Sequence, residues 1–391
     1  MFAFLSRTRN PVIRLAAVAA FLGLAACDPV AGPGGGPSID TSAPVPVALL
    51  VPAGSGQASD ALLARSLENA ARLAISDLSG VRIDLRVYQT GGSAAQAGTA
   101  AQRAVAEGAQ IILGPVFAQE ANAAGVAVAP AGINVLSFSN NTDIAGGNVF
   151  VLGNTFENTA NRLVRYAARQ GQRRVMIVHD RTQAGEIGRA AVARAVASAG
   201  STLAGTASYE FSQAGIVQAV PSIVAQARGA GADALFLTAD TAGALPLLTQ
   251  MLRDNGLTPA TARYLGLTRW DVPQATLSLP GVQGGWFALP DPALFDQFQG
   301  RYISAFGEPP HPIAGLAYDG IAAIGALVRS GRSDALSRAA LTQPSGFVGV
   351  SGVFRLRSDG SNERALAVAE VRNNQVVVID PAPRSFPGAG F

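Results

Sequence analysis

The chain has 391 residues, of which 49% are hydrophobic and 14% are charged, so it can bury a core larger than one domain usually holds. We therefore expect two domains. The formal net charge is +3, and Arg7, Arg9 and Arg14 near the start account for it. The remaining chain is close to neutral, which gives no support for a nucleic-acid partner.

The first 26 residues have the three parts of an export signal. A basic start is followed by an apolar run at 15–24, and small residues precede the only cysteine, Cys27. The apolar run is shorter than the roughly 20 residues that span a bilayer, so we predict a cleaved signal peptide at 1–26. With a single cysteine, no intramolecular disulfide can form.

The sequence Leu24-Ala25-Ala26-Cys27 resembles the bacterial lipobox. This resemblance implies that the Cys27 thiol carries a diacylglycerol and that the protein is lipid-anchored to a membrane in the periplasm. The alternative is a small apolar cysteine that happens to follow a signal peptide. Asp28 resembles an inner-membrane retention residue, but we leave open whether the membrane is the inner or the outer one.

Two segments are rich in Pro, Gly and Ser and bury little apolar surface. Residues 27–44 are predicted to be a flexible tether and residues 381–391 a flexible tail. Apart from the signal, no apolar run is long enough to span a membrane.

Between these segments, strand-like and helical patterns alternate. Strands are predicted at residues 45–51, 81–89, 110–113, 135–138, 174–179, 202–209, 234–238, 262–267 and 286–289, and helices at 60–78, 93–107, 117–124, 157–170, 185–199, 217–229, 242–255, 292–306 and 313–328. The end of the chain differs. Residues 352–356, 365–371 and 375–379 are predicted to form a hairpin-rich sheet, with a turn at Asn373-Asn374.

Strict alternation of strands and helices predicts an α/β fold with parallel sheets and right-handed crossovers. For a chain of two domains, this means two doubly wound parallel-sheet domains that face each other. Ligands of such sheets bind beyond the carboxyl ends of the strands. The default binding site is therefore the cleft between the domains.

Several segments, in this order, are similar to the type I periplasmic-binding fold of leucine/isoleucine/valine-binding proteins. They include residues 111–115, 133–137, 149–154, 173–180, 232–237, 317–320 and 351–354. The resemblance implies three hinge crossovers between the domains. They are expected near residues 153–156, 289–292 and 342–349.

These crossovers set the expected domain boundaries. Domain I would comprise residues 45–154 and 290–343, and domain II residues 155–289 and 344–380. Three connecting segments favour closure of the two domains around a ligand.

The resemblance also implies where a ligand would bind. Hydroxyl and amide groups at Ser137, Ser139 and Asn141 are expected to contact it, together with Asp180, Asp240 and Trp270 near strand ends. Asp240 could instead cap a helix, and Trp270 could instead anchor a loop in the core. No metal site and no cofactor are predicted.

Two residues that amino-acid binders of this family use are replaced. Ala118 stands where a serine hydroxyl is expected and Ala184 where a tyrosine is expected. This weakens the case for ordinary amino-acid capture. A lipid-anchored binding fold with such a site resembles the penicillin-binding protein activators, which stimulate a peptidoglycan synthase.

The alternative hypothesis is the substrate-binding lipoprotein of an ABC importer, which passes a branched-chain amino acid or another small polar ligand to a permease. The expected partner is thus a penicillin-binding protein or an ABC permease. An enzyme is not expected, because His179 and His311 are the only histidines and no nucleophile elbow, phosphate loop or zinc pattern is present.

Overall fold

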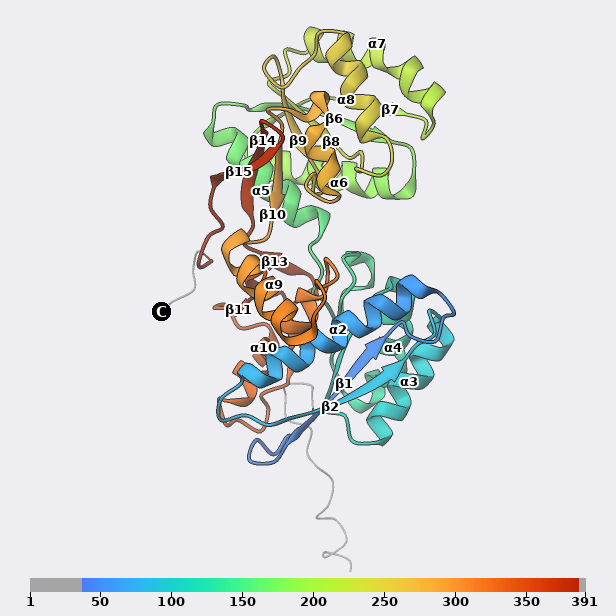
Figure 1. Cartoon of the computed structure of the whole chain (residues 1–391), viewed down its shortest axis with the longest axis vertical. Coiled ribbons are helices and arrows are strands. Elements are labelled where there is room, and N and C mark those ends of the chain that lie inside the picture. The colour runs from blue at the N-terminus through green and yellow to red at the C-terminus, as the bar shows by residue number, and fades with distance from the viewer. Residues whose placement is uncertain (1–36, 387–391) are drawn as a thin grey trace, which may run out of the picture.

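A computed structural model describes residues 37–386, which form two lobes stacked along the long axis of the molecule (Figure 1). Each lobe contains a mainly parallel sheet with helices on both faces. The predicted α/β fold with two parallel-sheet domains is confirmed.

The sheet of the first lobe has five parallel strands in the order β2-β1-β3-β4-β5. Its strands are β1 (Val45–Val51), β2 (Ile83–Gln89), β3 (Ile111–Leu113), β4 (Val135–Ser137) and β5 (Val149–Val151). Four helices pack on it: α2 (Ala58–Asp77), α3 (Ala94–Ala106), α4 (Ala118–Val128) and α10 (Gly315–Val328). A fifth helix, α9 (Pro292–Phe306), adds Phe298 and Tyr302 to the core that α2 and α10 form.

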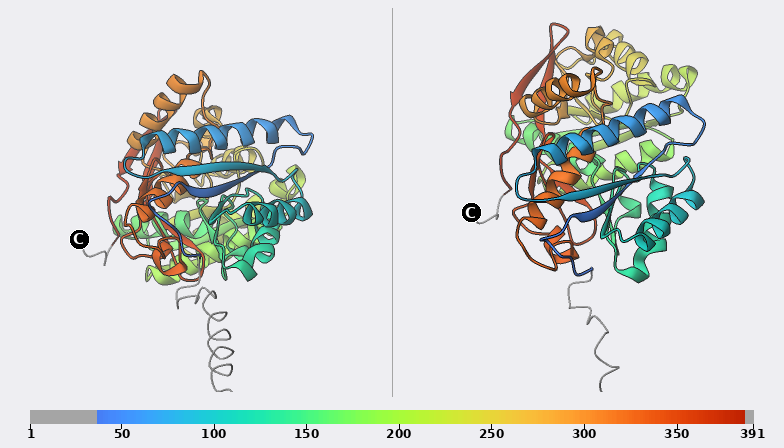
Figure 2. Two further views of the ribbon diagram at one scale, coloured as in Figure 1. Left: turned by 90° about the horizontal axis from the view of Figure 1, so that it is seen from below. Right: turned by 60° about the horizontal axis from the view of Figure 1, so that its bottom comes forward.

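The side chains of β1 alternate between the two faces of this sheet. Val47 and Leu49 face the core that α2 and α10 cover, whereas Ala48 and Leu50 face α3 and α4. In Figure 2 the long blue helix α2 lies along one face of the sheet. Helices α2 and α10 are far apart in the sequence but contribute to one core, so residues 58–77 pack together with residues 315–328.

The second lobe has a seven-stranded sheet in the order β15-β14-β10-β9-β8-β6-β7. The parallel strands are β6 (Arg174–Asp180), β7 (Thr202–Tyr209), β8 (Ala234–Leu237), β9 (Arg263–Gly266) and β10 (Trp286–Leu289). Two antiparallel strands, β14 (Ala367–Arg372) and β15 (Gln375–Asp380), complete one edge. Asn373 and Asn374 connect these two strands, and their φ values of 52° and 62° confirm the predicted tight turn.

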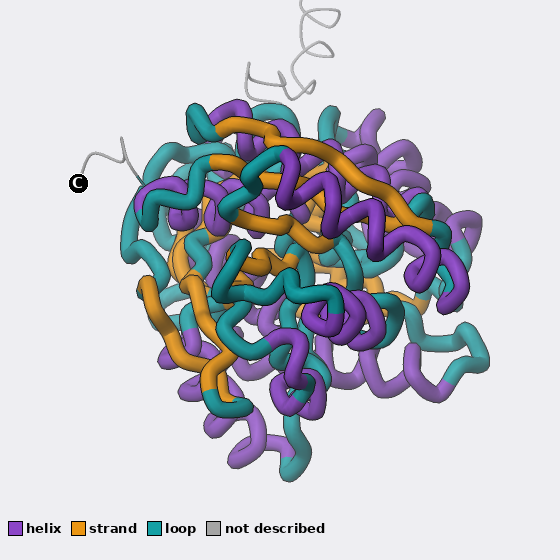
Figure 3. The backbone as a smooth tube through the Cα atoms, turned by 90° about the horizontal axis from the view of Figure 1, so that it is seen from above, coloured by secondary structure: helices purple, strands orange, loops and turns teal. Residues whose placement is uncertain are grey.

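Helices cover both faces of the second sheet. Figure 3 shows strands (orange) lying among helices (purple) in the molecule as a whole. One face packs against α5 (Phe156–Arg169) and α6 (Gln183–Ser198), and the other against α7 (Gln213–Gly229) and α8 (Leu245–Asp254). The remaining short helical elements are α11 (Arg338–Leu341) and the 3-10 turns Ala129–Ala131, Thr142–Ile144, Gln274–Ser278 and Pro280–Val282.

The last strands are divided between two sheets and do not form the single sheet that the sequence predicts. A separate antiparallel sheet contains β11 (Phe347–Gly349), β12 (Gly352–Leu356) and β13 (Asn362–Arg364). Phe347 and Phe354 belong to the core of the first lobe, whereas the chain joins the second sheet at β14. We therefore propose that the third crossing lies at residues 365–366, and the predicted domain boundaries remain a prediction.

The other two crossings connect β5 to α5 and β10 to α9. Their residues, 152–155 and 290–291, lie close to the predicted positions. Each of the three crossings connects an element of one lobe to an element of the other. The crossings are therefore the segments about which the lobes would rotate.

Both predicted flexible segments are partly packed. Ile39 is buried in the core of the first lobe, and its N–H donates to the Ser333 carbonyl at 2.8 Å. Phe386 is buried against Val353 and Ala365. Burial of these two apolar side chains stabilises part of each segment, although the glycine and proline content predicts flexibility. Residues 1–36, with the predicted signal and Cys27, lie outside the described part of the chain.

Between residues 37 and 386, the structure has no helix that is both long enough and apolar enough to cross a membrane.

Candidate functional site

A cavity of about 330 Å³ lies between the two lobes, next to the crossings. The first lobe contributes Phe295 and the start of α10, the second lobe contributes the loops after β8 and β9, and the crossings contribute residues from all three connections. The lining residues are Asn154, Thr241, Thr268, Arg269, Val272, Pro290, Phe295, Pro312, Ile313, Gly315, Leu316, Ser351, Arg364 and Leu366. The cavity therefore has the position at which a hinged two-lobe protein encloses a ligand.

The strands of the second sheet place two hydroxyl groups in this cavity. Thr268 follows β9, and its hydroxyl lies 3.5 Å from the Ala239 carbonyl, at the limit of a hydrogen bond. Thr241 follows β8, and its hydroxyl donates to the Val272 carbonyl at 2.7 Å. Thr268 is thus the hydroxyl that is freer to contact a ligand.

The charge at the rim is largely neutralised. Arg269 lines the cavity, and its Nε donates to Asp271 Oδ1 at 2.9 Å. Asp271 itself does not line the cavity, and none of the described residues that line it is acidic. The walls therefore present guanidinium, hydroxyl and amide groups but no carboxylate.

Arg364 is the most buried charged residue of the wall. Its Nη1 donates to Asp319 Oδ2 at 2.9 Å and its Nε donates to the Leu152 carbonyl at 2.7 Å. The two side chains of the ion pair are 3% and 0% exposed. Asp319 also accepts the Val350 N–H at 2.8 Å, so one buried carboxylate links α10 to the segment before β12.

Burial raises the pKa of the Asp319 carboxyl, and the Arg364 guanidinium opposes this effect. Each charge of the pair compensates the other, and removing either partner would leave an uncompensated buried charge. Arg364 is therefore held in a fixed position at the crossings.

The first three predicted ligand residues use their polar groups locally. Ser137 is fully buried, and its hydroxyl donates to the Pro115 carbonyl at 3.0 Å. The Ser139 hydroxyl accepts the Asn141 N–H at 3.1 Å. Asn141 Oδ1 accepts the Asp143 N–H at 2.9 Å and caps a 3-10 turn. These bonds shape the loop after β4.

Asp180 behaves similarly in the second lobe. Its Oδ1 accepts the Thr182 N–H at 3.0 Å, in the turn that begins α6. Asp240 is exposed, and the residue that caps α8 is Ala244, so Asp240 does not serve as the helix cap that we considered.

Trp270 is fully buried in the core of the second lobe, not in the cleft. Its ring lies against the backbones of Gly266 and Gly285, where a Cβ atom would come within 2.4 Å of the indole. It is thus the loop anchor that the sequence offered as the alternative. None of the six predicted residues lines the 330 Å³ cavity, and ligand contact by the other five remains a prediction.

Few sequence patterns point to the residues that do line the cavity. Asn154 ends a segment that carries the family resemblance, but no ligand role was inferred for it. Arg364 had no signal, because its partners Asp319 and Leu152 are 45 and 212 positions away along the chain.

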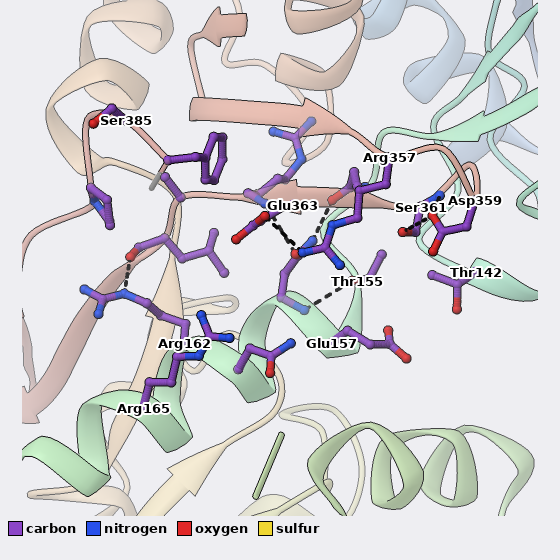
Figure 4. Close-up of a pocket in the computed structure, with 18 of the residues that line it drawn as sticks. Thr142, Thr155, Glu157, Arg162, Arg165, Arg357, Asp359, Ser361, Glu363 and Ser385 are labelled. Atoms are coloured by element: carbon purple, nitrogen blue, oxygen red, sulfur yellow. Dashed lines mark hydrogen bonds and ion pairs between the residues drawn. The ribbon is translucent and has the colours of Figure 1, made fainter. Parts of the chain in front are cut away.

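A larger cavity of about 530 Å³ lies between α5 and the turn after β12 (Figure 4). Arg162 and Arg165 on α5 line one side, and Arg357 and Glu363 lie on the other. Arg162 pairs with Asp380 at 2.7 Å and Arg357 with Glu363 at 3.0 Å. Both cavities have lining residues from both lobes, and we place the candidate site in the smaller one because it lies at the carboxyl ends of β8 and β9.

Comparison with known proteins agrees with this architecture. Residues 44–375 match the periplasmic binding protein family. The chain belongs to this family. No curated protein sequence matches it.

Solved structures of periplasmic binding proteins show the same fold. A branched-chain amino acid ABC transporter periplasmic ligand-binding protein from Burkholderia xenovorans LB400 is 19% identical, with a TM-score of 0.68 over 86% of this chain and 96% of that one. An ABC transporter substrate-binding protein from Desulfitobacterium hafniense, in complex with Leu, is 18% identical, with a TM-score of 0.64 over 86% of this chain and 100% of that one.

A third structure holds a different ligand. The solute-binding protein of an ABC transporter from Rhodopseudomonas palustris BisB5, in complex with 3,4-dihydroxybenzoic acid, is 18% identical, with a TM-score of 0.59 over 88% of this chain and 97% of that one. At these identities the similarity establishes the fold, and the ligand must be inferred from the site of this chain.

Proposed function

We propose that this periplasmic binding protein captures a small solute between its lobes and delivers it to the permease of an ABC importer. The observation that carries this proposal is the 330 Å³ cavity, which both lobes and the crossings line. A solute in this cavity would contact both lobes and so favour the closed arrangement.

The structural neighbours support the same role. Their names describe ABC transporter binding proteins, and two of them hold a small carboxylic or amino acid. Lipid attachment at Cys27 would keep the protein at the membrane in the periplasm, next to a permease. This proposal implies a location at the membrane in the periplasm and an ABC permease as the partner.

The proposal is tested by thermal unfolding of the purified chain in the presence of small carboxylates and amino acids. A binder present at about 100 times its Kd stabilises the folded protein by about 2.7 kcal/mol, which raises the Tm by several degrees. Affinity capture from membranes should then recover an ABC permease. Failure of every compound to raise the Tm would contradict solute binding.

A penicillin-binding protein activator is the second candidate. It is favoured by the local use of the Ser137, Ser139 and Asn141 side chains, which an amino-acid binder would turn toward its ligand. For this candidate, capture from membranes should recover a peptidoglycan synthase, and no solute should raise the Tm.

A further inference from the structure

Two polar atoms at the crossings are buried without a hydrogen-bond partner among residues 37–386. They are Arg364 Nη2, a donor, and Asn154 Oδ1, an acceptor. Both residues line the interlobe cavity. A buried polar group without a partner costs about 1–3 kcal/mol, so a ligand that satisfied both atoms would gain affinity from them.

Arg364 lines both the interlobe cavity and the larger cavity on α5. Its side-chain partners are Leu152, two residues before Asn154, and Asp319 on α10, whose first turn lines the cavity. Its backbone N–H points the other way and donates to Asn158 Oδ1 at 3.3 Å, at the larger cavity on α5. Because the side-chain hydrogen bonds of Arg364 run to the first crossing and to α10, we assign the free Nη2 to the interlobe cavity.

The cavity has no group that would neutralise an ammonium ion. Its two charged lining residues, Arg269 and Arg364, are both cationic, and their acidic partners Asp271 and Asp319 are not part of the described wall. A buried ammonium without a carboxylate partner would be costly. A free carboxylate would instead accept a charge-assisted hydrogen bond from the unpartnered Arg364 Nη2.

The rest of the wall is mostly apolar. Val272 comes from the loop after β9, Leu366 from the third crossing, and Phe295, Ile313 and Leu316 from the first lobe. A ligand of this cavity therefore needs an apolar body as well as a polar end.

We propose that the ligand is a small apolar carboxylate without an ammonium group, whose carboxylate accepts hydrogen bonds from Arg364 Nη2. This inference rests on the proposed solute-binding function and specifies the ligand class. A hydroxyl or a second N–H on the ligand would satisfy Asn154 Oδ1.

The test compares four compounds of similar shape by titration calorimetry and thermal unfolding of the purified full chain. They are 4-methylpentanoate, its neutral amide, 3-methylbutylamine and leucine. We expect 4-methylpentanoate to bind at least about tenfold more tightly than each of the others, since a hydrogen bond to a charged group contributes roughly that factor or more.

Two substitutions assign this preference to the cavity. Arg364→Gln should weaken 4-methylpentanoate binding by at least about tenfold, provided that circular dichroism shows a folded protein. If that variant does not fold, Thr268→Glu tests the same point, because Thr268 is partly exposed and makes only a 3.5 Å contact. This added carboxylate should shift the preference toward leucine and the amine. The matched control Thr261→Glu, at an exposed residue outside the cavity, should not change it.

The outcomes distinguish failure of the proposed ligand class from failure of solute binding itself. Tighter binding of leucine or of the amine than of the acid would overturn the ligand class and leave solute binding intact. The same follows if folded Arg364→Gln binds the acid as well as the unmodified chain does, or if Thr268→Glu leaves the preference unchanged. If none of a wider panel of solutes binds, the proposed function itself fails.

Discussion

Arg364 and Asp319 form an ion pair in which both partners are nearly inaccessible to water. Such a pair adds little net stability compared with apolar residues, but breaking it is expensive. The pair joins α10 of the first lobe to the strand that precedes the third crossing, so it fixes the geometry of the hinge region.

We expect Asp319→Asn to lower the free energy of unfolding by about 3–5 kcal/mol, because the Arg364 charge would then be buried without a counter-charge. Chemical denaturation at neutral pH measures this loss. The control is Arg332→Gln, which breaks a pair whose side chains are 67% and 51% exposed and should leave the denaturation midpoint unchanged. Similar losses for both variants would show that burial of the Arg364–Asp319 pair has no special role.

The limits of sequence-based prediction are clear at this scale. The positions of Ser137 and Asp180 at strand ends follow from the pattern, but the direction and partners of each side chain do not. Trp270 follows β9 as expected, yet the neighbouring glycines Gly266 and Gly285 leave space for its ring inside the core. The role of Arg364 depends on contacts between distant segments, which no local pattern reveals.

At the scale of helices and strands, alternation was sufficient to predict the parallel sheets. Strands β5, β11 and β13 are not among the predicted strands. Each has only three residues, and although β3 and β4 are equally short and were predicted, so short a segment shows little periodic pattern. The third crossing depends on β13, because that strand pairs with β12 just before the chain enters the second sheet. Its position was therefore the least predictable of the three.

Two glycines inside helices illustrate how packing decides the effect of a substitution. Gly300 in α9 is exposed, and an added Cβ atom would meet no atom within 4 Å. Gly320 in α10 faces the first sheet, and its Cβ atom would lie 2.4 Å from Leu113 Cδ1. The same change to alanine should thus have opposite effects at the two positions.

We expect Gly300→Ala to stabilise the protein by about 0.5–1 kcal/mol, because alanine has the better helix propensity. Gly320→Ala should destabilise it by about 1–3 kcal/mol through overpacking. Thermal unfolding of both variants checks the signs. If Gly320→Ala stabilised the protein as much as Gly300→Ala did, the close contact between α10 and β3 would be refuted.

At the scale of the whole molecule, two lobes joined by three crossings enclose a cavity that is lined from both sides. This arrangement couples ligand binding to lobe closure, because a ligand stabilises the arrangement in which it contacts both lobes. The predicted lipid on Cys27 would confine this motion to a membrane surface, where a permease could distinguish the closed form from the open one.

Small-angle X-ray scattering of the purified chain, with and without saturating 4-methylpentanoate, tests solute capture most directly. We expect a smaller radius of gyration with the acid present, and no change for the Arg364→Gln chain at a concentration where calorimetry shows that chain to be unoccupied. An unchanged radius at a concentration where calorimetry shows full occupancy would contradict closure of the lobes around the ligand.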